Sequence, residues 1–169
     1  MNMPLSKLTC DQFGLKAARM LLPLDLAACP LEIFPLANGF ARPFDGEIIL
    51  LHVLDCRTNG TGRDAQAMQC LERIRDDYLR PTVEASFRLR IGTPHEEILA
   101  EAKTTNVDLI LLPTFAPSIW RRLTGAYYGE TARNLIAGAS CRVFVVDVRG
   151  RFNCFRQWAK GELCGQWAA

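Results

Sequence analysis

Largely apolar runs recur along the chain and predict its buried strands. Each run is short and continuous, and those at 18–25 ("ARMLLPLD") and 46–56 ("GEIILLHVLDC") are closed by an acidic residue. Uniformly apolar runs of this length are typical of parallel strands covered on both faces. The predicted buried strands are 18–25, 46–56, 107–113 and 142–148.

Residues 83–91 follow a different pattern. Apolar and polar positions alternate through "VEASFRLRI", with Val83, Phe87 and Ile91 on one side and Arg88 and Arg90 on the other. Strict alternation predicts a strand with one dry face and one wet face. We therefore expect this strand at or near an edge of the sheet.

Helical patterns fill the gaps between these strands. Pro35 would interrupt the helix predicted over 30–41, so we expect a kink there. Thr93, Pro94 and Glu96 form the sequence of a capping box, which predicts a helix start at 93. The predicted helices are 30–41, 64–80, 93–106 and 129–139.

This alternation predicts an α/β fold. Five strands joined by helices imply right-handed crossovers and a doubly wound parallel sheet with helices on both faces. With the alternating strand at an edge, the expected strand order is 3-2-1-4-5. The loops after the first and fourth strands then flank the point where the winding reverses, which is where we expect any ligand.

Composition bounds the rest of the chain. The 169 residues are 49% hydrophobic with a formal net charge of +2, which suits one domain over 18–148, after a lead of 1–17 and before a basic and aromatic tail of 149–169. No apolar stretch approaches the roughly 20 residues of a membrane span, and nothing requires a nucleic-acid partner. Seven cysteines without a C-x-x-C spacing favour reduced thiols in the cytoplasm and no metal site.

Three segments carry a resemblance to a known family. The stretch "LLPLDLAACPLEIFPLANGFARPFDGEIILLHVLD" resembles the opening of universal stress protein domains, in which an Asp ends the first strand. "GTPHEEILAEAKTTNVDLILLP" and "YYGETARNLIAGASCRVFVVDV" resemble the middle and the end of the same domain. The likeness runs from Arg19 to Val148 and implies an adenine nucleotide alpha hydrolase-like fold.

The resemblance also locates a departure from the family's phosphate-binding motif. In the nucleotide-binding branch, the fourth strand is followed by Gly-x-x-Gly and then, after nine residues, by Gly and Ser or Thr. Here the first pair falls on Ala116 and Ile119, the third glycine is Gly129, and Glu130 replaces the hydroxyl residue. Because Glu130 adds negative charge where phosphate would bind, we expect no productive ATP binding and no cofactor.

The base end of the cleft matches the family better. Leu24, Asp25, Val53 and Leu112 fall at positions that contact adenine and ribose in nucleotide-binding relatives. Asp25 could accept a hydrogen bond from a ribose hydroxyl, or it could cap the next helix.

Two basic residues add a further possibility at the phosphate end. Arg121 and Arg122 could neutralise phosphate, or they could lie in solvent or pair with a carboxylate such as Glu130.

The function predicted from these residues is that of a regulatory or binding protein without catalysis. His52 lies inside an apolar strand, and no Ser/His/Asp or Cys/His arrangement is apparent. The alternative is an ATP-binding or AMP-binding stress protein with at most slow hydrolysis. Replacement of Ile119 and Glu130 would distinguish the two.

The remaining predictions concern partners. An apolar edge strand invites pairing, so we expect a homodimer joined through 142–148, together with an unidentified protein partner. The aromatic residues of the 149–169 tail could cover the sheet or a partner, or they could contact a membrane surface or nucleic acid.

Overall fold

The computed structural model describes residues 18–41, 45–54, 62–114, 129–147, 151–155 and 163–168, with the backbone alone for 147 and for the last two ranges. Within these ranges the strands are β1 (Arg19–Pro23), β2 (Glu47–Leu54), β3 (Glu84–Ile91), β4 (Leu109–Thr114), β5 (Arg142–Asp147), β6 (Arg151–Phe155) and β7 (Leu163–Ala168). The helices are α1 (Ile33–Ala41), α2 (Arg63–Tyr78), α3 (Pro94–Thr104) and α5 (Glu130–Gly138).

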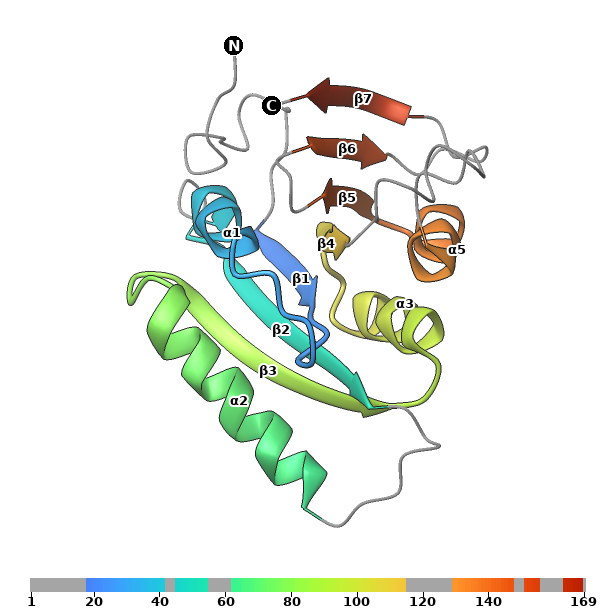
Figure 1. The fold of residues 1–169 in the computed structure, drawn as a ribbon. Helices are drawn as coiled ribbons and strands as arrows, with labels where there is room; N and C mark the ends of the chain where they lie inside the picture. Colours follow the sequence, from blue (N-terminus) through green and yellow to red (C-terminus); the bar gives the residue numbers. More distant parts are fainter. Residues whose placement is uncertain are drawn as a thin grey trace.

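The strands form one sheet in the order β3-β2-β1-β4-β5-β6-β7 (Figure 1). The pairs among β1 to β5 are all parallel, which confirms the predicted doubly wound sheet and its 3-2-1-4-5 order. The direction in which successive strands are added to the sheet therefore reverses between β1 and β4.

One prediction about this sheet is wrong, because the strand at 142–148 is not an edge. β6 pairs antiparallel with β5, and β7 pairs antiparallel with β6, so the sheet continues for two strands beyond the parallel part. The backbone edge on which we expected a homodimer to form is thus occupied by β6. An apolar strand with an open edge accepts another strand, and here the tail supplies it.

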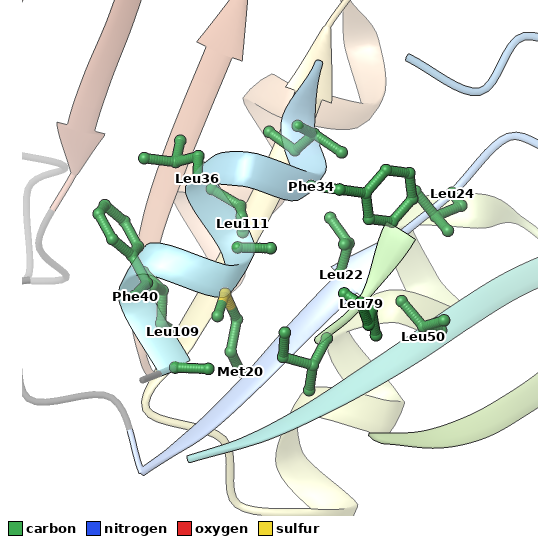
Figure 2. Packing of buried hydrophobic residues seen from close by; sticks show 14 of the residues in the cluster. Met20, Leu22, Leu24, Phe34, Leu36, Phe40, Leu50, Leu79, Leu109 and Leu111 are labelled. Atoms are coloured by element: carbon green, nitrogen blue, oxygen red, sulfur yellow. The ribbon is translucent and has the colours of Figure 1, made fainter. Parts of the chain in front are cut away.

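The central strands are buried on both faces, as their uniform apolar character predicted. Met20 and Leu22 point into one cluster with α1 and α2, whereas Leu21 points into a second cluster with α3 and α5. Figure 2 shows the first cluster, in which Phe40 of α1 lies beside the strands. The rings of Phe40 and Phe144 meet edge to face, with centroids 5.2 Å apart.

Two expectations about helix starts need correction. α1 begins at Ile33, so Pro35 lies in its first turn, where the amide has no intrahelical partner and a proline removes no hydrogen bond. Thr93 and Pro94 do begin α3, but the Thr93 side chain makes no capping hydrogen bond. No helix within the described ranges is long and apolar enough to cross a membrane.

The β3 edge differs from its prediction in one respect: α3 covers part of its polar face, at Arg90, whereas Glu84 and Arg88 stay exposed. Arg90 Nε donates to Glu101 Oε2 at 2.6 Å, and Arg88 Nε lies 3.3 Å from Glu101 Oε1. Glu101 is only 3% exposed. Ser86 Oγ donates to Glu47 Oε1 at 2.6 Å in the same layer. Charged residues are tolerated here because each has a partner of opposite sign.

Candidate functional site

The candidate site lies where β1 and β4 separate. β1 and β4 pair only at Met20 with Leu109 and at Leu21 with Ile110, whereas β4 stays paired with β5 up to Thr114. Leu24 N–H donates to Leu51 O on β2, so the preceding residue, Pro23, faces β4. Proline has no N–H to extend the ladder, and the two strands therefore part at their carboxyl ends.

A cavity of about 430 Å³ opens at this point. Its walls bring together six of the eight predicted site residues, namely Leu24, Asp25, Val53, Leu112, Gly129 and Glu130. The other two, Arg121 and Arg122, fall in 115–128 together with Ala116 and Ile119, and so lie outside the described residues.

Apolar side chains form much of the cavity wall. Leu24 and Leu112 are both nearly buried, and Val53 packs against the same cluster as Ile98 of α3. These residues reach the cavity because the strand ends and the start of α3 converge at this edge of the sheet. A wall of this kind suits a flat apolar group such as an aromatic ring.

Asp25 begins the loop after β1 and closes a turn within it. Its Oδ1 accepts from the Ala27 N–H at 3.0 Å, and the Ala28 N–H donates to the Asp25 carbonyl. Asp25 does not cap α1, which begins only at Ile33, so that expectation is wrong. Within the described residues Oδ2 has no hydrogen bond, which leaves one acceptor in the cavity wall. The ribose contact stays a prediction.

His52 ties the end of β1 to β2. Its Nδ1 lies 2.9 Å from the Leu24 carbonyl oxygen. A carbonyl can only accept, so Nδ1 carries the hydrogen and donates. This bond fixes the strand end from which the Asp25 loop departs, which is a structural role for the histidine.

The N-terminus of α5 forms the opposite wall. Gly129 is its N-cap residue and Glu130 its first helical residue, with no side-chain cap hydrogen bond. A carboxylate at this position interacts favourably with the helix dipole. A methyl group added at Gly129 would meet nothing within 4 Å, so the backbone there is open to an approaching group.

Sequence reasoning missed several lining residues. Pro30, Pro94, Ile98 and Thr131 also contact the cavity. Pro30 and Thr131 follow the first and fourth strands, where a ligand was expected, and their positions could have been inferred. The contact of Ile98 with the cavity could not have been inferred, because an apolar residue in a helix predicts only that its side chain faces the sheet.

Cys29 and Cys141 are poor nucleophiles. Burial raises the pKa of Cys29 to about 11, with smaller effects of Cys70, Asp25 and Glu32. Burial likewise raises the pKa of Cys141 to about 11. Among the described residues no cluster of His, Cys, Asp and Glu could hold a metal ion.

Comparison with solved structures supports the fold. The protein MJ0577 shares 24% identity with a TM-score of 0.59, over 77% of this chain and 95% of its own. UspA from Lactobacillus plantarum shares 20% identity with a TM-score of 0.57, over 76% and 97%. A universal stress protein in complex with cAMP shares 15% identity with a TM-score of 0.57, over 79% and 99%.

None of the curated proteins compared with the chain matches it. The sequence profile of the Universal stress protein family, however, matches residues 17–147, which span β1 through β5 and both walls of the cavity. The chain therefore belongs to the Universal stress protein family.

Proposed function

We propose that this chain is a non-catalytic regulatory protein whose cleft binds a small ligand with an apolar ring and hydrogen-bond donors, and which does not hold ATP productively. The observation that carries this proposal is Glu130, which lines the cavity at the first position of α5. Asp25 adds a second carboxylate to the lining of the same cavity. A nucleoside suits these groups better than a polyphosphate does.

Glu130 disfavours a polyphosphate in this cavity because its charge has the same sign. Two like charges 4 Å apart repel by about 4 kcal/mol at a partly shielded protein surface. A phosphate placed at the N-terminus of α5 would meet Glu130, whose charge already offsets the helix dipole there. Ligand hydroxyl and amino groups, in contrast, would find acceptors in the Asp25 and Glu130 carboxylates.

The described lining of the cavity supports a protein without catalysis. Thr114 is a lining hydroxyl residue, but its Oγ1 donates to the Val146 carbonyl at 3.3 Å rather than to a base. His52, the lining imidazole, is held by Leu24 through Nδ1. Within the described residues no hydroxyl or thiol is hydrogen-bonded to a general base in this cavity, as nucleophilic catalysis requires. The output of binding would then be a contact with a protein partner.

Calorimetry with ATP, AMP and adenosine tests the ligand class. For the unmodified protein, adenosine should bind more tightly than ATP. In Glu130→Ser, ATP affinity should rise tenfold or more, about 1.4 kcal/mol, while adenosine affinity changes little. Glu96→Ser is the matched control, because Glu96 lies in the first turn of α3 but does not line the cavity. Tight ATP binding that Glu130→Ser leaves unchanged would contradict the proposal.

Adenine nucleotide binding with slow hydrolysis is the second candidate, and the apolar wall beside Asp25 favours it. The solved relative in complex with cAMP gives it further support. Mass spectrometry of the molecules released when the purified protein is denatured distinguishes the two. ATP or AMP recovered at one per chain would favour this second candidate over the first.

A cytoplasmic location forms part of the same proposal. Cys29, Cys70 and Cys141 are free thiols in the described part of the chain. Free thiols are typical of a reducing compartment.

A further inference from the structure

The β3 strand ends the sheet and has an open backbone edge. In the part of the chain that the structure describes, β2 is its one strand neighbour, paired in parallel from Glu84 to Ile91. No residue of β3 is fully buried, whereas most residues of β1, β2 and β4 are. Figure 1 shows β3 at the limit of the sheet, on the side away from β7.

The hydrogen bonds to β2 show which backbone groups of β3 stay open. The Gly92 N–H donates to the Leu54 carbonyl at 3.0 Å, so the backbone of Gly92 faces β2. Successive residues of a strand direct their backbone groups to opposite sides, and every second residue back from Gly92 therefore also faces β2. The outward-facing N–H and C=O groups are those of Ala85, Phe87, Leu89 and Ile91.

Arg88 brings a positive charge to this open edge. Its Nη1 donates to the Phe87 carbonyl oxygen at 2.8 Å, so the guanidinium lies beside an outward-facing backbone group. The side chain is 46% exposed, and its Nε lies 3.3 Å from Glu101 of α3. Because a guanidinium has five N–H donors, Arg88 can also bind a carboxylate that approaches from outside.

A second guanidinium lies beside Phe87 on the opposite face of the sheet. Arg75 of α2 stands over the Phe87 ring, with its Cζ atom 5.2 Å from the ring centroid. The Arg75 side chain is 42% exposed and donates from Nε to Asp76, which uses one of its five N–H donors. Arg75 and Arg88 therefore flank the middle of the edge, one on the α2 face and one on the α3 face.

We propose that the outer edge of β3 binds an extended segment of a partner protein, and that this segment carries acidic residues opposite Phe87. The open N–H and C=O groups would hydrogen-bond the segment as an added strand. Neighbouring residues of an added strand point to opposite faces, so two consecutive acidic residues would meet Arg75 and Arg88. No residue of β3 is among the described residues that line the cavity, so this surface is separate from the ligand site.

An acidic segment suits this edge better than a second copy of the chain does. Two β3 strands related by a twofold axis would bring two copies each of Arg75 and Arg88 to one edge. Like charges on neighbouring strands destabilise the pairing, whereas opposite charges stabilise it. Ile91, which is 60% exposed at the end of β3, offers an apolar contact to the same segment.

Peptide binding to the full chain tests the proposal. The probe is a capped peptide of about ten residues with two adjacent central Glu among Val and Thr, and its counterpart has Lys in place of both Glu. Amide hydrogen exchange is followed by NMR spectroscopy. At about ten times its Kd, the Glu peptide should slow exchange about tenfold at Phe87, Leu89 and Ile91. Exchange at Arg88 and Arg90, which face β2, should not change, and the Lys peptide should slow none of these amides.

Single charge removals provide the matched comparison. Arg75→Gln and Arg88→Gln should each weaken binding of the Glu peptide about threefold. Arg133→Gln, which removes an exposed charge from α5, should leave that binding unchanged. Equal binding of the two peptides, or no protection of the outward-facing amides, would overturn the proposal. Protection that rises with protein concentration in the absence of peptide would also overturn it, because a second copy would then occupy the edge.

Discussion

The two sides of the sheet are protected in different ways. On the β3 side, Glu101 of α3 binds Arg90 and Arg88 and so covers part of a polar strand with paired charges. On the β5 side, Val143 to Val146 lie in an apolar core, and the chain's own β6 closes the edge. Alternating polarity predicts that a strand lies at an edge of the sheet. A uniformly apolar strand predicts only that both of its faces are covered.

The largest expected effect comes from opening the core on the β5 side. Phe144→Ala should lower the free energy of unfolding by about 3 to 5 kcal/mol, because Phe144 is fully buried and the cavity left behind cannot collapse completely. Phe144→Leu keeps most of the volume and should lose less. Urea denaturation followed by circular dichroism measures both changes. A loss of stability for Phe144→Ala no larger than that for Phe144→Leu would show that the β5 side can repack.

A smaller loss is expected on the β3 side. Glu101→Gln keeps the shape of the side chain but removes the charge that faces Arg88 and Arg90, and it should lower the free energy of unfolding by about 2 to 3 kcal/mol. Arg90 retains its contact with Glu97 at 3.2 Å, which limits the effect. Glu96→Gln, on the exposed surface of the same helix, should change stability by less than about 0.5 kcal/mol. Equal losses of stability in the two variants would mean that the ion pairs of Glu101 with Arg88 and Arg90 do not stabilise the packing of α3 on β3.

Ser86 offers a finer probe of the same side. Ser86→Ala removes the hydrogen bond to Glu47 and should lower the free energy of unfolding by about 1 kcal/mol, because the carboxylate keeps Arg19 as a partner. The comparison variant is Glu84→Ala, in the same strand but exposed, which should be nearly neutral. If Ser86→Ala is also neutral, the hydrogen bond between Ser86 and Glu47 does not contribute to the free energy of unfolding.

The smallest effect concerns Cys141, which lies just before β5. Burial raises the pKa of this thiol from 9.0 to about 11, so the folded state favours the protonated form. The stabilisation is complete below pH 9.0 and is lost as pH rises through 11. At pH 8 the thiolate fraction is about 0.001 in the folded protein and about 0.1 in the unfolded chain. Alkylation by iodoacetamide, followed by mass spectrometry, should therefore be much slower in the native state, and equal rates would show that the start of β5 is open.

The sequence allowed the parallel part of the fold to be predicted because four of its strands are distinct apolar runs, whereas β3 shows the alternation of an edge strand. The cavity followed from the same reasoning, since Leu24, Val53 and Leu112 lie at or near strand ends that a doubly wound sheet brings together. β6 and β7 were not predicted, because their residues resemble a basic and aromatic tail, and the edge of β5 that accepts β6 exists only once the sheet has formed.

Asp25 shows a second reason why a prediction from the sequence was wrong. A carboxylate after a strand can cap a helix or close a turn, and the choice depends on where the helix begins. α1 begins at Ile33, too far along the chain for Asp25 to reach its first amides. The kink expected at Pro35 was wrong for the same reason, because the later start of α1 puts Pro35 in its first turn. Boundaries of elements are set by the packing of the whole domain as well as by local residues.

The separation of β1 from β4 has a consequence for the speed of binding. Because Pro23 ends the pairing between these strands, a ligand that enters the cavity between them breaks no backbone hydrogen bond among the described residues of β1 and β4. Association should then be a single bimolecular step whose observed rate rises linearly with ligand concentration and does not level off. Differences in affinity among related ligands would arise mainly from how slowly each one leaves.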